Sequence, residues 1–205
     1  MATCTYCFVA AWCLTSYLRG LDLTTVAGSR DTRLAKLDAT SSPFSCILLA
    51  TAGLVRLGLA HRITQRLHPS VFPYAVGQGA LGIEVKTGRT DMLRLVGRAD
   101  HKPSRWLGMA ERAMLRTLQG GCSSPIGVWS SLEPLKQNEL PDSTCAREGG
   151  NLRLRATVLH IDGTSEVSAA DVGPVQCDEE AERLGVSVAN MLLQKGARTL
   201  LAKHV

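Results

Sequence analysis

The sequence has few aromatic residues and no long run of apolar residues or of like charges. Aromatic residues make up 4% of the 205 positions, which argues against a nucleic-acid surface built on stacked rings. The net charge of +5 is spread along the chain, whereas a nucleic-acid surface gathers its basic residues. The modest excess of arginine suits small acidic ligands. The composition therefore predicts a protein without a nucleic-acid partner.

An apolar stretch near the start, residues 8–18, is too short to cross a membrane. A membrane-spanning helix needs about 20 apolar residues, and no basic residue precedes Arg19 as a secretory signal would require. The stretch is a buried strand, a short helix or the unnatural start of a truncated gene model, and we favour the last of these. No membrane association is predicted.

The seven cysteines and five histidines form no disulfide framework and no ligand motif. An odd number of irregularly spaced cysteines indicates a reducing compartment, and we predict a cytoplasmic location. Cys4 and Cys7 form a C-x-x-C pair but lack two further ligands at comparable spacing. No metal site is predicted.

Hydrophobic periodicity predicts a mixture of helices and strands. Helices are expected over 42–58, 91–98, 104–119 and 178–195, and strands over 83–86, 126–129, 151–161 and 166–172. Residues 1–86 are not predicted to form a self-contained domain. Residues 88–205 read as an α+β domain of helix, strands and helix.

Four motifs occur in order along the chain. They are TRLAKLD from Thr32, the stretch 47–58 ending in AGLVRLG, AVGQGALGIE from Ala75, and ERAMLRTLQGGCSSPIG from Glu111. Together they resemble the porphobilinogen deaminase (hydroxymethylbilane synthase) family, of fungal type, over about residues 24–200. The resemblance implies α/β plus α+β architecture. Residues 1–73 would be part of a periplasmic-binding-protein-like second α/β domain, 74–87 the return strand of the first domain, and 88–205 the cofactor-carrying C-terminal domain.

The resemblance also implies an activity and a cofactor. Family members are transferases of tetrapyrrole and heme biosynthesis that condense four porphobilinogens to hydroxymethylbilane, and we expect a monomer. Cys122 occupies the position where the family attaches a dipyrromethane cofactor by a thioether. The residues alone suggest a small buried cysteine beside a helix end, since a helix C-terminus does not lower a thiol pKa. A durable covalent bond is compatible with such a thiol.

Two further residues match positions that the family uses near the cofactor. The family loop R-G-N-x-x-T-R binds carboxylates, and Arg33 matches its second arginine while Ala27 replaces the first. Arginine's planar fork suits carboxylates, although a solvated surface charge is the alternative. Gln78 lies in a G-Q-G turn that lines the family's cleft; alternatively, it simply caps a neighbouring strand.

The sequence lacks the family's D-G-x-x-x-K-D and S-x-x-R-R motifs. The first supplies the aspartate that protonates the leaving amine, so no catalytic residue can be named here. We therefore expect an N-terminally truncated chain that is inactive by itself. The alternative is a non-catalytic remnant that binds a ligand or a partner.

Overall fold

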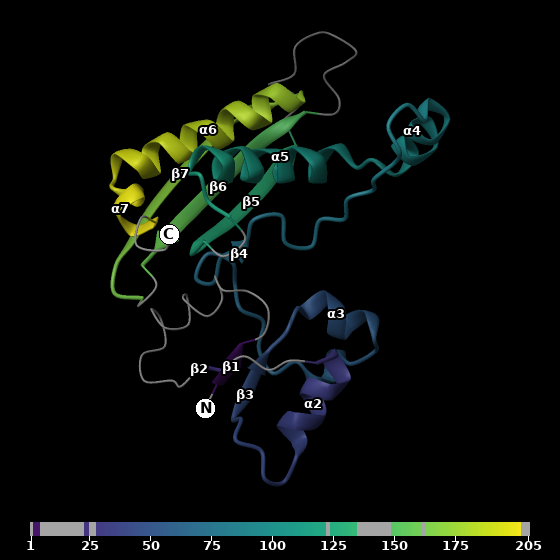
Figure 1. Ribbon diagram of the computed structural model, residues 1–205, viewed down its shortest axis with the longest axis vertical. Coiled ribbons are helices and arrows are strands. Elements are labelled where there is room, and N and C mark those ends of the chain that lie inside the picture. The colour runs from purple at the N-terminus through teal and green to yellow at the C-terminus, as the bar shows by residue number, and fades with distance from the viewer. Residues whose placement is uncertain are drawn as a thin grey trace.

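The computed structural model describes residues 2–4, 23–24, 28–121, 124–134, 149–160 and 163–201. Figure 1 shows two lobes, each built on its own sheet. The N-terminal lobe holds a parallel three-stranded sheet, and the C-terminal lobe an antiparallel four-stranded one. The predicted mixture of helix and sheet is confirmed.

The C-terminal sheet has the order β4-β5-β6-β7. Its strands are β4 (Tyr74–Ala75), β5 (Ile126–Pro134), β6 (Gly150–Leu159) and β7 (Glu166–Val175). Along β6, Leu152, Leu154, Ala156 and Val158 are buried, because alternate residues of a strand point to the same face. The three long strands that the sequence predicts are therefore confirmed, with β5 and β7 running longer than expected.

Helices α5 (Lys102–Thr117) and α6 (Asp178–Gln194) lie side by side against this sheet (Figure 1). The helix α6 begins with three acidic residues, which favour the positive end of a helix. It ends at Gln194, two residues before Gly196, whose φ of +90° suits glycine, and the short α7 (Ala197–Leu201) follows. The helix α5 begins two residues earlier than predicted, because the His101 ring accepts a hydrogen bond from the Ser104 amide.

The N-terminal lobe places β1 (Ala2–Cys4) between β2 (Leu23–Thr24) and β3 (Cys46–Leu48). The helices α2 (Arg30–Asp38) and α3 (Thr51–Arg56) and the turn η1 (Ala60–Arg62) complete the described part. The predicted helix over 42–58 is wrong in its first half. Residues 46–48 pair with β1 instead, and only the second half forms the helix α3.

The segment between the lobes is largely irregular. The predicted strand over 83–86 is not formed, since residues 81–86 have no regular structure. Leu81 is 89% exposed and Ile83 61% exposed, so their apolar side chains are not covered by a neighbouring described element. The predicted helix at 91–98 is confirmed as α4 (Thr90–Val96) followed by η2 (Gly97–Ala99).

Candidate functional site

The loop that contains Cys122 joins the end of α5 to the start of β5. The chain turns after Leu118, with Gln119 at a φ of +56° and the Gly120 amide bonded to the Leu115 carbonyl at 3.1 Å. A Cβ on Gly120 would lie 2.7 Å from Ile126 Cδ1 and 2.8 Å from Leu115 Cδ1. Glycine at this position therefore lets the chain reverse tightly between the helix and the strand.

Cys122 and Ser123 lie outside the described residues, but both flanks of Cys122 are well defined. The Gly121 amide donates to Ser124 Oγ at 2.8 Å, and the Ser124 amide donates to the Gly121 carbonyl at 3.0 Å. The Ile126 amide then bonds to the Ser124 carbonyl at 2.8 Å. The two bonds between Gly121 and Ser124 fix the described residues on either side of Cys122 and Ser123.

The flanks of Cys122 fit a bulky covalent group. Gly121 is exposed, and no described atom lies within 4 Å of the place where its Cβ would stand. The flanks are thus anchored through Gly120 and Ser124, while no described atom crowds Gly121. This arrangement can hold a permanently attached group, whereas the electronegative helix end offers no activation of a thiol for turnover.

Gln78 lies in the turn that follows β4. Gly77 and Gly79 have φ values of +69° and +86°, which only glycine adopts readily. The Gln78 side chain accepts a hydrogen bond from the Ala75 amide at 3.1 Å through its Oε1. The glutamine therefore closes its own turn through its amide oxygen, and its amide nitrogen takes no part in that bond.

Glu111 is a buried carboxylate that was not singled out from the sequence. It lies on α5 with 9% of its surface exposed. Its Oε2 accepts a hydrogen bond from the Gly77 amide at 2.7 Å, and its Oε1 accepts one from Ser130 Oγ at 2.5 Å. Glu111 thereby ties the glycine turn to both α5 and β5.

Arg33 lies in the first turn of α2, where a loop was expected from the sequence. Ser29 begins this helix, since its Oγ accepts a hydrogen bond from the Thr32 amide at 3.2 Å. Arg33 is half-buried, and its amide bonds to the Ser29 carbonyl at 3.0 Å. The combination of Ser29 with the acidic Asp31 was the available signal for a helix start.

Strand β5 links the turn that contains Gln78 to the described residues that follow Cys122 in the sequence. Ala75, before the Gln78 turn, pairs with Gly127, which follows the Cys122 loop by a few residues. Arg33 lies on α2 in the other lobe (Figure 1). The turn and the loop therefore share the start of β5, while Arg33 is carried by a separate element.

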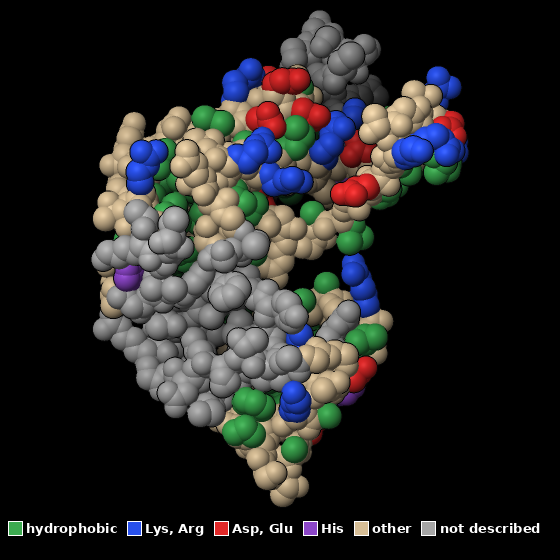
Figure 2. Space-filling model, viewed as in Figure 1, with side chains coloured by type: hydrophobic (Ala, Val, Ile, Leu, Met, Phe, Trp, Pro, Cys, Tyr) green, Lys and Arg blue, Asp and Glu red, His purple; other side chains and the backbone are tan. Residues whose placement is uncertain are grey.

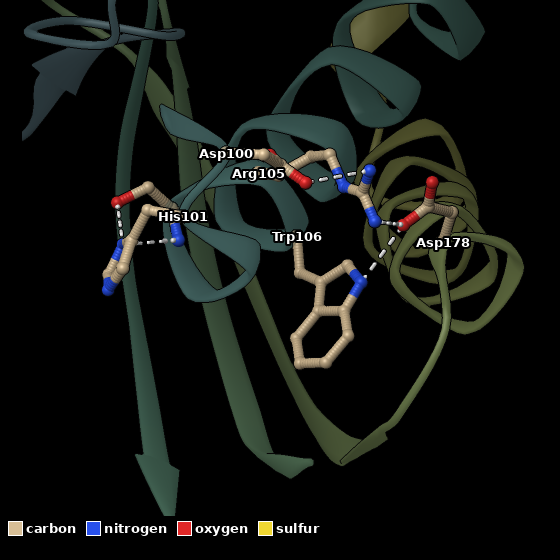
Figure 3. A network of polar contacts seen from close by, with 6 residues as sticks. Asp100, His101, Arg105, Trp106 and Asp178 are labelled. Atoms are coloured by element: carbon tan, nitrogen blue, oxygen red, sulfur yellow. Dashed lines mark hydrogen bonds and ion pairs between the residues drawn. The ribbon is translucent and has the colours of Figure 1, made fainter. Parts of the chain in front are cut away.

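A second polar cluster lies at the opposite end of α5 (Figure 3). The Trp106 indole donates to Asp178 Oδ1 at 3.0 Å, and Arg105 pairs with Asp178 at 3.0 Å and with Asp100 at 3.1 Å. These bonds join the first turns of α5 and α6. A pocket of about 250 Å³ lies against them, lined also by Lys102 and Cys177.

The charges in this pocket are balanced, and its thiol is not activated. A backbone hydrogen bond at Glu180 favours the Cys177 thiolate, but the Glu179 hydrogen bond, desolvation and the two glutamate charges outweigh it, so the pKa of Cys177 is raised.

Among the described residues, no group of three His, Cys, Asp or Glu side chains could hold a metal ion. Figure 2 shows basic and acidic side chains interspersed on the upper lobe. In the same described part of the chain, no helix is long and apolar enough to cross a membrane.

Comparison with known proteins matches both lobes to one family. Residues 10–94 match the family model of the porphobilinogen deaminase dipyromethane cofactor binding domain, and residues 107–194 that of the porphobilinogen deaminase C-terminal domain. The first range includes Arg33 and Gln78, and the second includes Cys122.

Curated relatives support the same assignment. The chain is 42% identical to a porphobilinogen deaminase of Debaryomyces hansenii over 176 residues, which are 86% of this chain and 45% of that protein. It is 39% identical to that of Schizosaccharomyces pombe over 188 residues, 92% of this chain and 52% of the relative. For Saccharomyces cerevisiae the values are 40% over 182 residues, 88% and 52%. The chain spans about half the length of these relatives, and it belongs to the porphobilinogen deaminase family.

Proposed function

We propose that this chain forms the cofactor-carrying part of a hydroxymethylbilane synthase, which condenses four porphobilinogens to hydroxymethylbilane and releases ammonia. The observation that carries this proposal is the anchoring of Gly120, Gly121 and Ser124, the residues that flank Cys122 in the sequence between α5 and β5. These residues lie within the match to the family's C-terminal domain.

Three residues have proposed roles in this function. Cys122 holds the dipyrromethane through a thioether, and the bound group supplies the primer to which pyrroles are added. Arg33 binds carboxylates of the cofactor or substrate, for which a guanidinium is well suited. Gln78 lines the same cleft. No residue of this chain can be named as the general acid.

Several broader properties belong to the same proposal. The N-terminal lobe would be part of a periplasmic-binding-protein-like α/β domain covering residues 1–73, followed by the return strand at 74–87 and the C-terminal domain at 88–205. The short parallel sheet with flanking helices supports an α/β lobe. We further propose a cytoplasmic monomer without a nucleic-acid or membrane partner, in keeping with the dispersed charge and the irregular cysteines.

A turnover experiment tests the proposal. The 205-residue chain alone and a chimera, in which residues 24–205 replace the matching part of the Schizosaccharomyces pombe relative, are incubated with porphobilinogen. We expect hydroxymethylbilane from the chimera and none from the chain alone, because general acid catalysis is typically worth about 10²–10⁴-fold. Turnover by the chain alone would show that the catalytic acid lies within it.

The same chimera tests Arg33 and the rival function. We expect Arg33→Ala to raise the KM for porphobilinogen by about tenfold, as the loss of a charge-assisted bond predicts, while Arg66→Ala, an exposed control, leaves it unchanged. The replacement of the family's first loop arginine by Ala27 favours a non-catalytic, ligand-binding remnant as the alternative. A chimera that binds porphobilinogen without releasing ammonia would support this alternative.

A further inference from the structure

The Glu111 carboxylate is buried and has a partner for each of its oxygens. Burying a carboxylate is costly unless hydrogen bonds compensate, and here the Gly77 amide and Ser130 Oγ provide them at 2.7 and 2.5 Å. The two partners belong to different elements, since Gly77 lies in the turn after β4 and Ser130 lies on β5. The carboxylate therefore holds a turn rather than filling space in the core.

Val76, directly before Gly77, packs against the core of the C-terminal lobe, and the backbone of the turn is attached to this lobe at two points. One is the short strand β4, where Tyr74 pairs with Val128 and Ala75 with Gly127. Two residues of pairing give a marginal strand by themselves. The second point is the bond to Glu111, which is charge-assisted and hence stronger than a bond between neutral groups.

We propose that Glu111 is a positioning residue that fixes the Gly77-Gln78-Gly79 turn beside the Cys122 loop. The proposal rests on the proposed function, because it assigns the turn a place in the cofactor and substrate cleft. Both Glu111 oxygens are bonded within the protein, to Gly77 and Ser130, so the proposal gives this residue an indirect role. It acts through the turn, whose other attachments are the two-residue strand β4 and the packing of Val76 against the core.

The geometry of the turn explains what it would recognise. Gln78 Oε1 is occupied by the Ala75 amide at 3.1 Å, so the amide nitrogen is the group that can face a ligand. An amide nitrogen carries two hydrogen-bond donors. The fixed turn therefore presents a donor suited to a carboxylate arm of the pyrrole chain.

Amide hydrogen exchange in the 205-residue chain tests whether Glu111 holds the turn. We expect Glu111→Ala to speed exchange of the Gly77 amide by at least about tenfold, because the amide loses its acceptor. Glu111→Gln should retain protection, since its amide oxygen can accept from Gly77 while its nitrogen donates to Ser130. Glu182→Ala is the matched control, because it removes a carboxylate that pairs with Arg116 of α5 at 2.8 Å.

Kinetics of the Schizosaccharomyces pombe chimera test the functional part. We expect Glu111→Ala to raise the KM for porphobilinogen by about tenfold with a smaller change in kcat, as a loosened binding turn predicts. Glu111→Gln should restore the KM. A purely structural defect would instead lower the amount of folded protein without moving the KM.

The outcomes separate the inference from the proposed function. Unchanged Gly77 exchange in a folded Glu111→Ala variant would overturn the positioning role, and so would faster exchange with an unaltered KM. A wild-type chimera that makes no hydroxymethylbilane would instead refute the proposed function, and with it the cleft assignment, while the exchange result would still decide whether Glu111 holds the turn.

Discussion

Cys177 and Cys46 illustrate, at the scale of single residues, how surroundings set thiol reactivity. Cys46 is exposed, whereas Cys177 is half-buried directly before α6. Backbone bonding at Glu180 favours the Cys177 thiolate, yet the acceptor Glu179, desolvation and the glutamate charges raise its pKa overall. A helix N-terminus alone would lower a thiol pKa, so the acidic residues reverse the usual effect.

These opposing effects predict that the Cys177 thiol is alkylated slowly. At pH 8, alkylation of Cys177 should be slower than that of Cys46 and should still increase above pH 9, because a raised pKa delays thiolate formation. Glu179→Gln removes a negative charge and replaces the carboxylate acceptor with a weaker, neutral one, so it should lower the pKa of Cys177 and speed alkylation about two- to threefold. Peptide mass spectrometry resolves the sites, and Glu182→Gln is the control. An unaltered rate in Glu179→Gln would refute the proposed cause.

Single residues also show which parts of the site could be predicted from the sequence. The Cys122 loop could be located because its determinants are local, namely a helix end, two glycines and a following strand. Glu111 could not, since its partners lie 34 and 19 residues away in the sequence. The available signal was a carboxylate within the apolar stripe of Leu107, Met114 and Leu118 on α5.

At the scale of elements, α5 and α6 pack closely against each other. Gly185 of α6 is buried, and a Cβ there would lie 2.1 Å from the Ala110 carbonyl oxygen. This contact involves backbone, so a side-chain rotation cannot relieve it. The two helices can approach this closely only because residue 185 is glycine.

Gly185→Ala should therefore lower the free energy of unfolding by about 1–3 kcal/mol, the usual cost of overpacking. The melting temperature should fall by several degrees. Gly108→Ala on α5 is the matched control, because a Cβ there meets no described atom within 4 Å. It should be neutral or stabilising, since alanine is the better helix former. Equal melting temperatures for both variants would contradict the close-packing account.

The segment between the lobes should be the point of cleavage by proteases. Residues 79–84 are exposed, and the nearby Lys86 and Arg89 offer trypsin sites in the same irregular stretch. Brief trypsin treatment should give a stable fragment that begins between Lys86 and Asp91, because residues 88–205 contain the three long strands of the C-terminal sheet and the helices α5 and α6. Arg153, within β6, should resist cleavage. Uniform resistance along the chain would contradict this division.

The elements show why local sequence reasoning fails in the N-terminal lobe. The apolar run at 44–48 fits a helix or a buried strand equally well. Its pairing with Ala2–Cys4 depends on residues more than 40 positions away, a contact that periodicity does not contain. In the C-terminal lobe, by contrast, consecutive strands pair with one another, and alternation in β6 was enough to predict them.

At the scale of the whole molecule, the two lobes contribute different parts of the proposed site. The C-terminal lobe holds the Cys122 loop and, through Glu111, the Gln78 turn. The N-terminal lobe carries Arg33 on α2. The chain spans about half the length of its relatives.

We propose that Cys122 is the single attachment point of the cofactor, and intact-mass measurement can show whether it is. The Schizosaccharomyces pombe chimera and its Cys122→Ala variant are incubated with porphobilinogen. Their intact masses are measured, and any adduct is located by peptide mass spectrometry. We expect the mass of one dipyrromethane on the peptide containing Cys122 and no adduct in the variant. An adduct that persists in Cys122→Ala, or one found on Cys46 or Cys177, would contradict the assignment.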